Sequence, residues 1–95
     1  MVGGLTLVHV PGIDRPHPYV DEHAEGWTDN DQRFMGFSAV VAALAASSAP
    51  DVVHLNDWHT SAVAGMLTDP PPMVLTIHTL GYQGVMDQSW LAHLP

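Results

Sequence analysis

Two stretches decide the fold of this chain: DVVHLNDWHT at residues 51–60 and MVLTIHTLGYQGV at residues 73–85. Each begins with a short run of β-forming residues, DVVHL at 51–55 and MVLTIH at 73–78, and each run leads directly into polar and aromatic side chains. The second run is continuous in β-formers, which is typical of a parallel strand that is covered on both faces. We therefore predict two buried strands with polar carboxyl ends.

The rest of the chain predicts helices between strands. The run LTLVHV at residues 5–10, closed by Pro11 and Gly12, indicates a first strand, and residues 11–28 indicate a long polar loop. A helix should follow, capped by one of residues 28–30, because apolar positions recur at helical spacing; its expected face consists of Phe34, Phe37, Val41, Leu44 and Ser48.

Two shorter helices complete the expected order. One should cover residues 61–67 behind Thr60, and the other residues 87–94 with Asp87 as its cap. Strands alternating with helices predict an α/β fold, here a partial Rossmann-like parallel sheet in β-α-β-α-β order within one domain over residues 1–95. In such sheets ligands bind at the carboxyl ends of the strands.

Charge and composition exclude several classes of protein. The 95 residues include 10 acidic side chains but only two fixed cations, Arg15 and Arg33, so the formal net charge is -8. Two arginines cannot form the basic patch of a nucleic-acid binder or of a cationic membrane-surface helix. There is no cysteine for a disulfide or a Cys-based zinc site. The apolar stretch at 34–49 falls short of the ~20 residues of a membrane span, and without a signal-like start we expect a cytoplasmic protein.

Polar residues gather where the second and third predicted strands end. Asp57, Trp58 and His59 follow one strand, and His78 ends the other, so a parallel sheet would place them near one another. A carboxylate, an imidazole and an indole face can bind sugar hydroxyls and a sugar ring. These residues have simpler roles as well, since Asp57 or Thr60 could cap a helix and Trp58 could serve packing.

The same region allows a metal-dependent hydrolase as an alternative. His54, Asp57, His59 and His78 are side chains that bind zinc or another divalent ion. Their spacing matches no strong pattern such as HExxH, and no glycine-rich phosphate loop or GxSxG elbow follows a strand.

The two opening stretches resemble the family of bacterial glycogen synthases and plant starch synthases, the retaining glycosyltransferases of family five. DVVHLNDWHT is similar to that family's DVVHxHDWHT-like strand and turn, and TIHTLGYQG to its TxHNLAYQG-like strand and loop. VPGIDRPHPY, TDNDQRFMGFS and VMDQSWLAHLP are similar to further family segments in the same order. The resemblance covers nearly the whole chain.

The resemblance implies part of the N-terminal, acceptor-side domain of a GT-B enzyme that moves glucose from ADP-glucose or UDP-glucose to an α-1,4-glucan. It implies no cofactor and no essential metal. By the same resemblance, Asp57 lines the cleft near the transferred glucose, and His78 contacts the donor sugar through its ring and backbone carbonyl. The implied substrate-binding residues are Tyr19, Trp58, His59, Tyr82 and Gln83.

Several positions depart from the family pattern. Thr79 stands where the family has asparagine, Gly81 where it has alanine, and Asn56 where histidine is common. The family's lysine-glycine-glycine loop and its C-terminal phosphate-binding domain have no counterpart in the sequence, so we expect a fragment that is inactive by itself. A non-catalytic glucan-binding module remains an alternative, beside the metal-dependent hydrolase.

Overall fold

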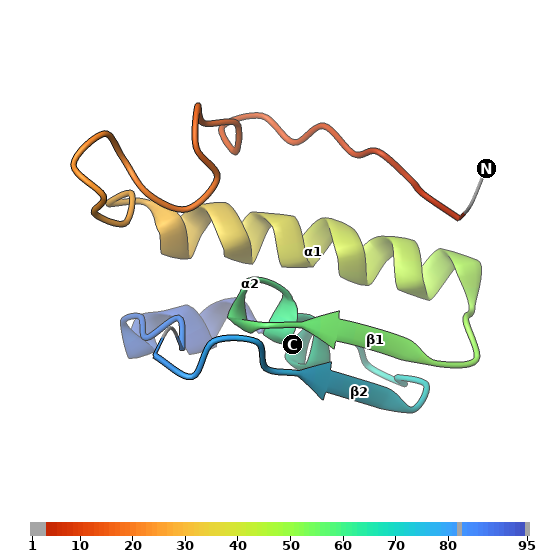
Figure 1. The fold of residues 1–95 in the computed structure, drawn as a ribbon. Coiled ribbons are helices and arrows are strands. Elements are labelled where there is room, and N and C mark those ends of the chain that lie inside the picture. The colour runs from red at the N-terminus through yellow and green to blue at the C-terminus, as the bar shows by residue number, and fades with distance from the viewer. Residues whose placement is uncertain (1–3, 82, 95) are drawn as a thin grey trace.

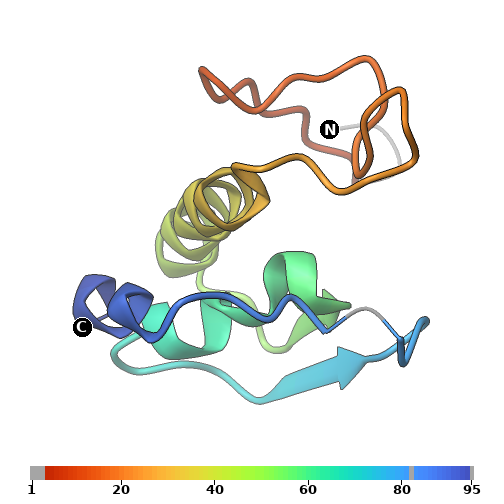
Figure 2. The same cartoon turned by 90° about the vertical axis from the view of Figure 1, so that its left-hand side faces the viewer.

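The computed structural model describes residues 4–81 and 83–94, which contain helices and one pair of strands joined by loops. In chain order the elements are α1 (Asn30–Ser48), β1 (Val53–Asn56), α2 (Trp58–Ser61), α3 (Val63–Met66), β2 (Met73–Thr76) and the 3-10 helix η1 (Gln88–His93). Figures 1 and 2 show α1 running alongside the β1–β2 pair, with the chain before it on the opposite side of the helix. Among the described residues, no helix is long and apolar enough to cross a membrane.

The two strands that follow α1 form the parallel pair that the sequence predicts. Val53 pairs with Met73, and the register continues to Asn56 opposite Thr76. The connection between them passes through α2 and α3, as a parallel crossover requires. The parallel α/β arrangement is therefore confirmed for these two strands. The predicted burial of the second strand is wrong for the described residues, because Val74 and Leu75 are 53% and 49% exposed.

Residues 5–10 do not form the strand that their composition predicts. The segment is extended but unpaired, and Leu5 and Leu7 are 71% and 88% exposed. In Figure 1 it runs along the side of α1 that faces away from the sheet. A strand needs a neighbour for its backbone hydrogen bonds, and α1 lies between this segment and β1–β2. The prediction of a first strand at residues 5–10, in the β-α-β-α-β order, is therefore wrong for the described residues.

Helix α1 is confirmed, but its buried face only partly overlaps the expected one: Phe34 is buried and Val41 packs against the core, as predicted. Its buried residues are Arg33, Phe34, Met35, Ser38 and Ala42, whereas Leu44 is 41% exposed. The small side chains of Ser38 and Ala42 let the helix lie close to α2 and α3, and Ser38 Oγ donates to the backbone oxygen of His59 at 3.1 Å. The face of α1 that is buried is therefore determined by how closely the helix can pack against α2 and α3, and not by the apolar periodicity alone.

The second predicted helix is two short helices that begin earlier than expected. α2 starts at Trp58, directly after Asp57 turns the chain out of β1, and α3 resumes at Val63. At the junction the Gly65 N–H donates to the oxygen of Ala62, a 3-10 type bond of 3.0 Å, so the turn tightens there. The last helix lies where it was predicted, as η1, and Asp87 caps it by accepting from the Ser89 N–H at 2.8 Å.

The core lies between α1, the strands and α3. Ala42, Leu55 and Val63 are buried together, and Val63 is fully covered. Partly buried apolar side chains surround them: Val41, Val53, Met66, Leu67 and Met73. This core packs Leu55 of β1 against Ala42 of α1, and the candidate site begins one residue after that strand.

Candidate functional site at the carboxyl ends of the strands

Asp57 links the ends of the two strands. Its N–H donates to the oxygen of Thr76 at 2.9 Å, and its carboxylate Oδ1 accepts from the His78 N–H at 2.7 Å. Its backbone has φ 59° and ψ -176°, a conformation that a residue with a side chain rarely adopts. The two hydrogen bonds hold Asp57 in this strained turn, which directs the next residues away from the sheet.

His78 lies beside Asp57 and is held by a second hydrogen bond. Its ring Nε2 pairs with Asn56 Oδ1 at 2.9 Å, while its backbone N–H is bound to Asp57. Asn56 is itself tied to Thr60, whose hydroxyl accepts from the Asn56 N–H and donates to its oxygen, each at 3.0 Å. The imidazole of His78 is exposed, and the hydrogen bond to Asn56 sets its orientation.

Aromatic rings gather on the other side of Asp57. The His59 ring lies 4.4 Å from Trp58 and 4.7 Å from both Tyr19 and Phe34, measured between ring centroids. Gly84 lies against the face of Trp58, because a Cβ added at Gly84 would overlap that ring. Residues from the early loop, α1, α2 and the late loop therefore build one aromatic cluster.

Burial among these rings lowers the pKa of His59 from its ordinary value, and the nearby negative charge of Asp57 opposes that shift. The imidazole consequently stays neutral to lower pH than an exposed histidine does. A neutral imidazole can both donate to and accept from a hydroxyl group.

A hollow of about 310 Å³ opens between Asp57 and the aromatic cluster. Its lining consists of His17, Tyr19, Val20, Asp57, Trp58, His59 and Thr79. Apolar ring faces beside a carboxylate, an imidazole and hydroxyl groups form a surface that suits a sugar, which offers one apolar face and a rim of hydroxyl groups.

Comparison with known proteins identifies the family of the chain. The family described as "Starch synthase catalytic domain" matches residues 4–95. The chain belongs to that family.

Curated relatives carry the name glycogen synthase. The chain is 37% identical to "Glycogen synthase" of Granulibacter bethesdensis, over 99% of this chain and 22% of that protein. It is 41% identical to "Glycogen synthase 2" of Nitrosococcus oceani, over 88% of this chain and 19% of that protein. The chain thus spans about a fifth of the length of the curated relatives that it matches.

Within this family member, four of the predicted site residues come together around the hollow: Tyr19, Asp57, Trp58 and His59. His78 touches the group through its N–H bond to Asp57. Gln83 lies apart, since its amide donates to the oxygen of Leu80 at 3.0 Å and it lines a separate hollow beside Trp58. Tyr82 lies outside the described residues.

Three further residues line the hollow that the sequence did not single out for binding: His17, Val20 and Thr79. His17 turns its Nδ1 toward the N–H groups of Tyr19 and Val20, 3.3 Å from each, and so shapes the loop. Thr79 brings a hydroxyl where the family pattern has an amide. The position of Thr79 inside the TxHxL motif was a usable signal, whereas His17 carried none beyond its place between two prolines.

The four residues of the metal alternative do not form a metal site. Among residues 4–81 and 83–94, no three histidine, aspartate or glutamate side chains are grouped to hold a metal ion. His54 Nε2 lies 2.7 Å from Thr76 Oγ1, and His78 pairs with Asn56. Together with the names of the relatives, this does not favour a metal-dependent hydrolase, and those names do not favour a non-catalytic glucan module either.

Proposed function

We propose that this chain forms the acceptor-side part of a retaining glucosyltransferase of the glycogen synthase type. In that role it belongs to the N-terminal domain of a GT-B enzyme that moves glucose from ADP-glucose or UDP-glucose to the end of an α-1,4-glucan. Family membership over residues 4–95 and the names of the relatives support the reaction class.

The hollow beside Asp57 is the observation that carries this proposal. Tyr19, Trp58 and His59 offer ring faces and polar edges for glucan residues, and Asp57 lies at the junction with the sheet. Glycosyl transfer with retention passes through a positively charged, oxocarbenium-like state. Fixed carboxylate and carbonyl dipoles at the ends of the strands stabilise such a charge without rearranging during the reaction.

His78 has a defined part in this scheme. Its N–H is committed to Asp57 and its ring to Asn56, so its backbone carbonyl and the outer edge of its ring have a set orientation. We propose that these two groups bind the donor glucose. Precise orientation of a sugar against its acceptor lowers the barrier by removing motion that would otherwise be lost in the transition state.

Grafting the chain into a relative tests the assignment. Residues 4–95 would replace the aligned segment of the Granulibacter bethesdensis protein, and glucose transfer to glycogen would be measured. Asp57→Ala and His78→Ala should each lower kcat by about 100-fold or more, as removal of one transition-state contact does. His9→Ala is the matched control. The His9 side chain is 76% exposed, its ion-pair partner is Asp14, and neither residue lines the hollow. Rates like those of the unmutated graft in both variants would refute the site.

The 95 residues by themselves should not transfer glucose from ADP-glucose to glycogen. Both fixed cations are already bound, Arg15 to Asp29 and Arg33 to loop carbonyls, so the chain offers no free guanidinium for the charge of a diphosphate. Turnover above the enzyme-free blank, measured with labelled ADP-glucose, would contradict this expectation.

A further inference from the structure

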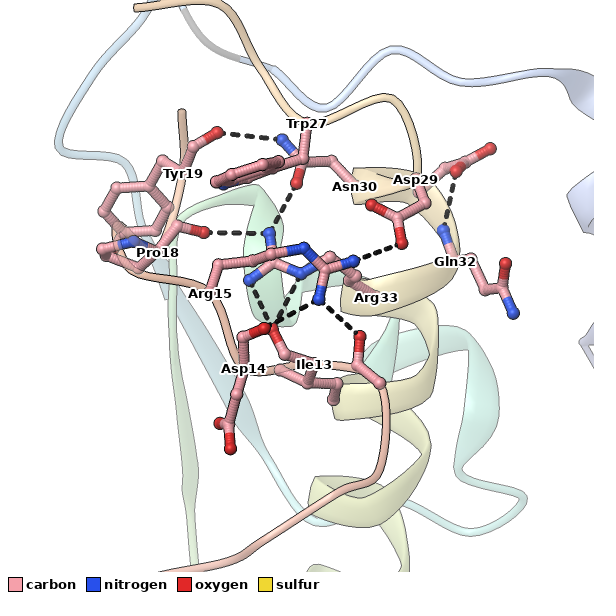
Figure 3. A network of polar contacts seen from close by, with 12 residues as sticks. Ile13, Asp14, Arg15, Pro18, Tyr19, Trp27, Asp29, Asn30, Gln32 and Arg33 are labelled. Carbon is pink, nitrogen blue, oxygen red and sulfur yellow. Dashed lines mark hydrogen bonds and ion pairs between the residues drawn. The ribbon is translucent and has the colours of Figure 1, made fainter. Parts of the chain in front are cut away.

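A buried arginine in the first turn of α1 binds the loop that carries Tyr19. Arg33 is only 4% exposed, and its guanidinium makes four hydrogen bonds (Figure 3). Nε and Nη2 donate to the oxygen of Ile13 at 2.9 and 2.7 Å, and Nη1 donates to the oxygens of Pro18 and of the Asn30 side chain at 3.0 and 2.7 Å. One side chain thereby holds both ends of the 13–18 segment.

Asn30 extends this attachment to Tyr19 itself. Its Oδ1 accepts from Arg33, and its Nδ2 donates to the backbone oxygen of Tyr19 at 3.1 Å. Figure 3 shows the hydrogen bonds leading from Arg33 through Asn30 to the backbone oxygen of Tyr19, whose ring points away from Asn30. Because consecutive carbonyls of Pro18 and Tyr19 are both bound, the direction in which the Tyr19 side chain leaves the loop is set.

The ring of Tyr19 has no deep pocket of its own. It is 45% exposed, and it meets the cluster through His59 at 4.7 Å and Phe34 at 6.3 Å. These two ring contacts leave much of Tyr19 exposed, so they are not enough by themselves to hold the ring in one orientation. Its place over His59 therefore depends on the loop backbone. Arg33 and Asn30 hold the carbonyls of Pro18 and Tyr19, and Trp27 Nε1 donates to the oxygen of the preceding His17 at 2.9 Å.

We propose that Arg33 and Asn30 are positioning residues for the candidate acceptor site. They set Tyr19 against His59 and so form one wall of the hollow beside Asp57. The guanidinium acts on backbone oxygens, and it does not bind the phosphates of a donor. The link to the acceptor rests on the proposed function; the link to Tyr19 does not.

The chemistry of the guanidinium explains why arginine serves here. Its planar fork presents several fixed donors, which match two carbonyls and one amide oxygen at once, whereas a lysine ammonium would match fewer. Burial lowers the pKa of Arg33, the charge of Arg15 adds to that effect, and Asp29 opposes it. The charge also lies 5.0 Å from the centre of the Phe34 ring.

Arg33→Lys is the deciding variant, because it keeps the charge and loses the fork. In the 95-residue chain, NMR should show two changes. The Tyr19–His59 ring contact should disappear from the nuclear Overhauser spectrum, and the pKa of His59 should rise toward the ordinary ~6.5 as its burial decreases.

Arg15→Lys is the matched control. Arg15 bonds Asp29 and the carbonyls of Gly12 and Asp14, and it touches neither Pro18 nor Tyr19. It should therefore leave the ring contact and the His59 pKa as they are. An intact contact in Arg33→Lys would overturn the proposal, and so would equal loss in both variants.

Asn30→Asp keeps the test decisive if Arg33→Lys does not fold. The carboxylate can still accept from Arg33, but the donor to the Tyr19 oxygen is removed. We expect a weaker ring contact in a chain with unchanged far-ultraviolet circular dichroism. Unchanged ring contact in the folded variant would overturn the role of Asn30.

Kinetics in the grafted enzyme separate this inference from the proposed function. Arg33→Lys should raise the KM for glucan by roughly tenfold and leave the KM for the nucleotide sugar unchanged, as a misplaced positioning group does. A lost ring contact with an unchanged glucan KM would refute the acceptor role of Tyr19 and leave the positioning role standing. A retained ring contact would refute the positioning role whatever the KM.

Discussion

Asp57 combines a strained backbone with a carboxylate at the centre of the site. Its positive φ costs roughly 1–3 kcal/mol for a residue that has a side chain. Hydrogen bonds to Thr76 and His78 hold the conformation and fasten β1 to β2 at the same time. A glycine would relax the turn but would remove the carboxylate, which holds the His78 N–H and which the proposed function requires.

His59 should make the stability of the chain depend on pH. Burial lowers its folded pKa, so as pH falls through the unfolded value of ~6.5 the unfolded state binds a proton first. The free energy of unfolding should therefore decrease below that pH and receive no contribution from His59 above it. Urea unfolding at acidic and at mildly basic pH should show a larger loss for the wild-type chain than for His59→Gln. Identical profiles for wild type and His59→Gln would contradict the prediction.

Gly84 should resist substitution because of Trp58. Its φ of 64° disfavours any side chain, and a Cβ would also overlap the indole ring. Gly84→Ala should destabilise the chain by more than the ~1–2 kcal/mol of the left-handed conformation and should shift tryptophan fluorescence. Gly12→Ala is the matched control, since Gly12 has φ 83° and an added Cβ there would have nothing within 4 Å. Equal losses of stability in the two variants would show that overlap with the Trp58 ring does not contribute to the effect of Gly84→Ala.

The ends of α1 show how tertiary contacts alter a helix that local rules describe well. Asp29 lies at the N-cap position, but its carboxylate binds Arg15 and makes no side-chain cap bond. At the other end Ala49 adopts the left-handed conformation that usually belongs to glycine, with φ 48° and ψ 58°, and its N–H closes the helix on Ala45.

Ala49→Gly should stabilise α1. Removing Cβ from a left-handed residue should raise the free energy of unfolding by about 0.5–1 kcal/mol, because the steric cost outweighs the added freedom of the unfolded chain. The comparison is Ala43→Gly, on the exposed surface of the same helix, which should lower it by about 1 kcal/mol. Denaturant titration of both variants measures the difference. Destabilisation by Ala49→Gly would contradict the steric argument.

At the scale of the molecule, repulsion between the negative charges lowers the stability of the folded chain. A formal net charge of -8 spreads over a chain whose buried apolar side chains are few, and both arginines are committed to one end of α1. Self-repulsion of this kind is longer in range at low ionic strength and is screened by salt.

Salt should therefore stabilise the chain. Raising NaCl from about 0.01 to 0.15 M shortens the screening length from about 30 to 8 Å. A gain of about 0.5 kcal/mol would raise the midpoint of thermal unfolding by roughly 2–4 °C for a chain of this size. Sucrose at equal osmolality controls for general solvent effects. A falling midpoint would mean that ion pairs such as Arg15–Asp29 outweigh the repulsion.

The sequence by itself determined α1, the parallel strands after it, the family and the cluster of Asp57, Trp58 and His59, because these follow from local periodicity and from motifs at adjacent positions. Only the tertiary structure decided that residues 5–10 stay unpaired, that Ser38 and Ala42 face the core, and that Arg33 holds the Tyr19 loop. Those outcomes depend on which surfaces meet. A strand needs a neighbour, a helix buries the face that allows the closest approach, and a guanidinium binds whichever carbonyls the fold brings within reach.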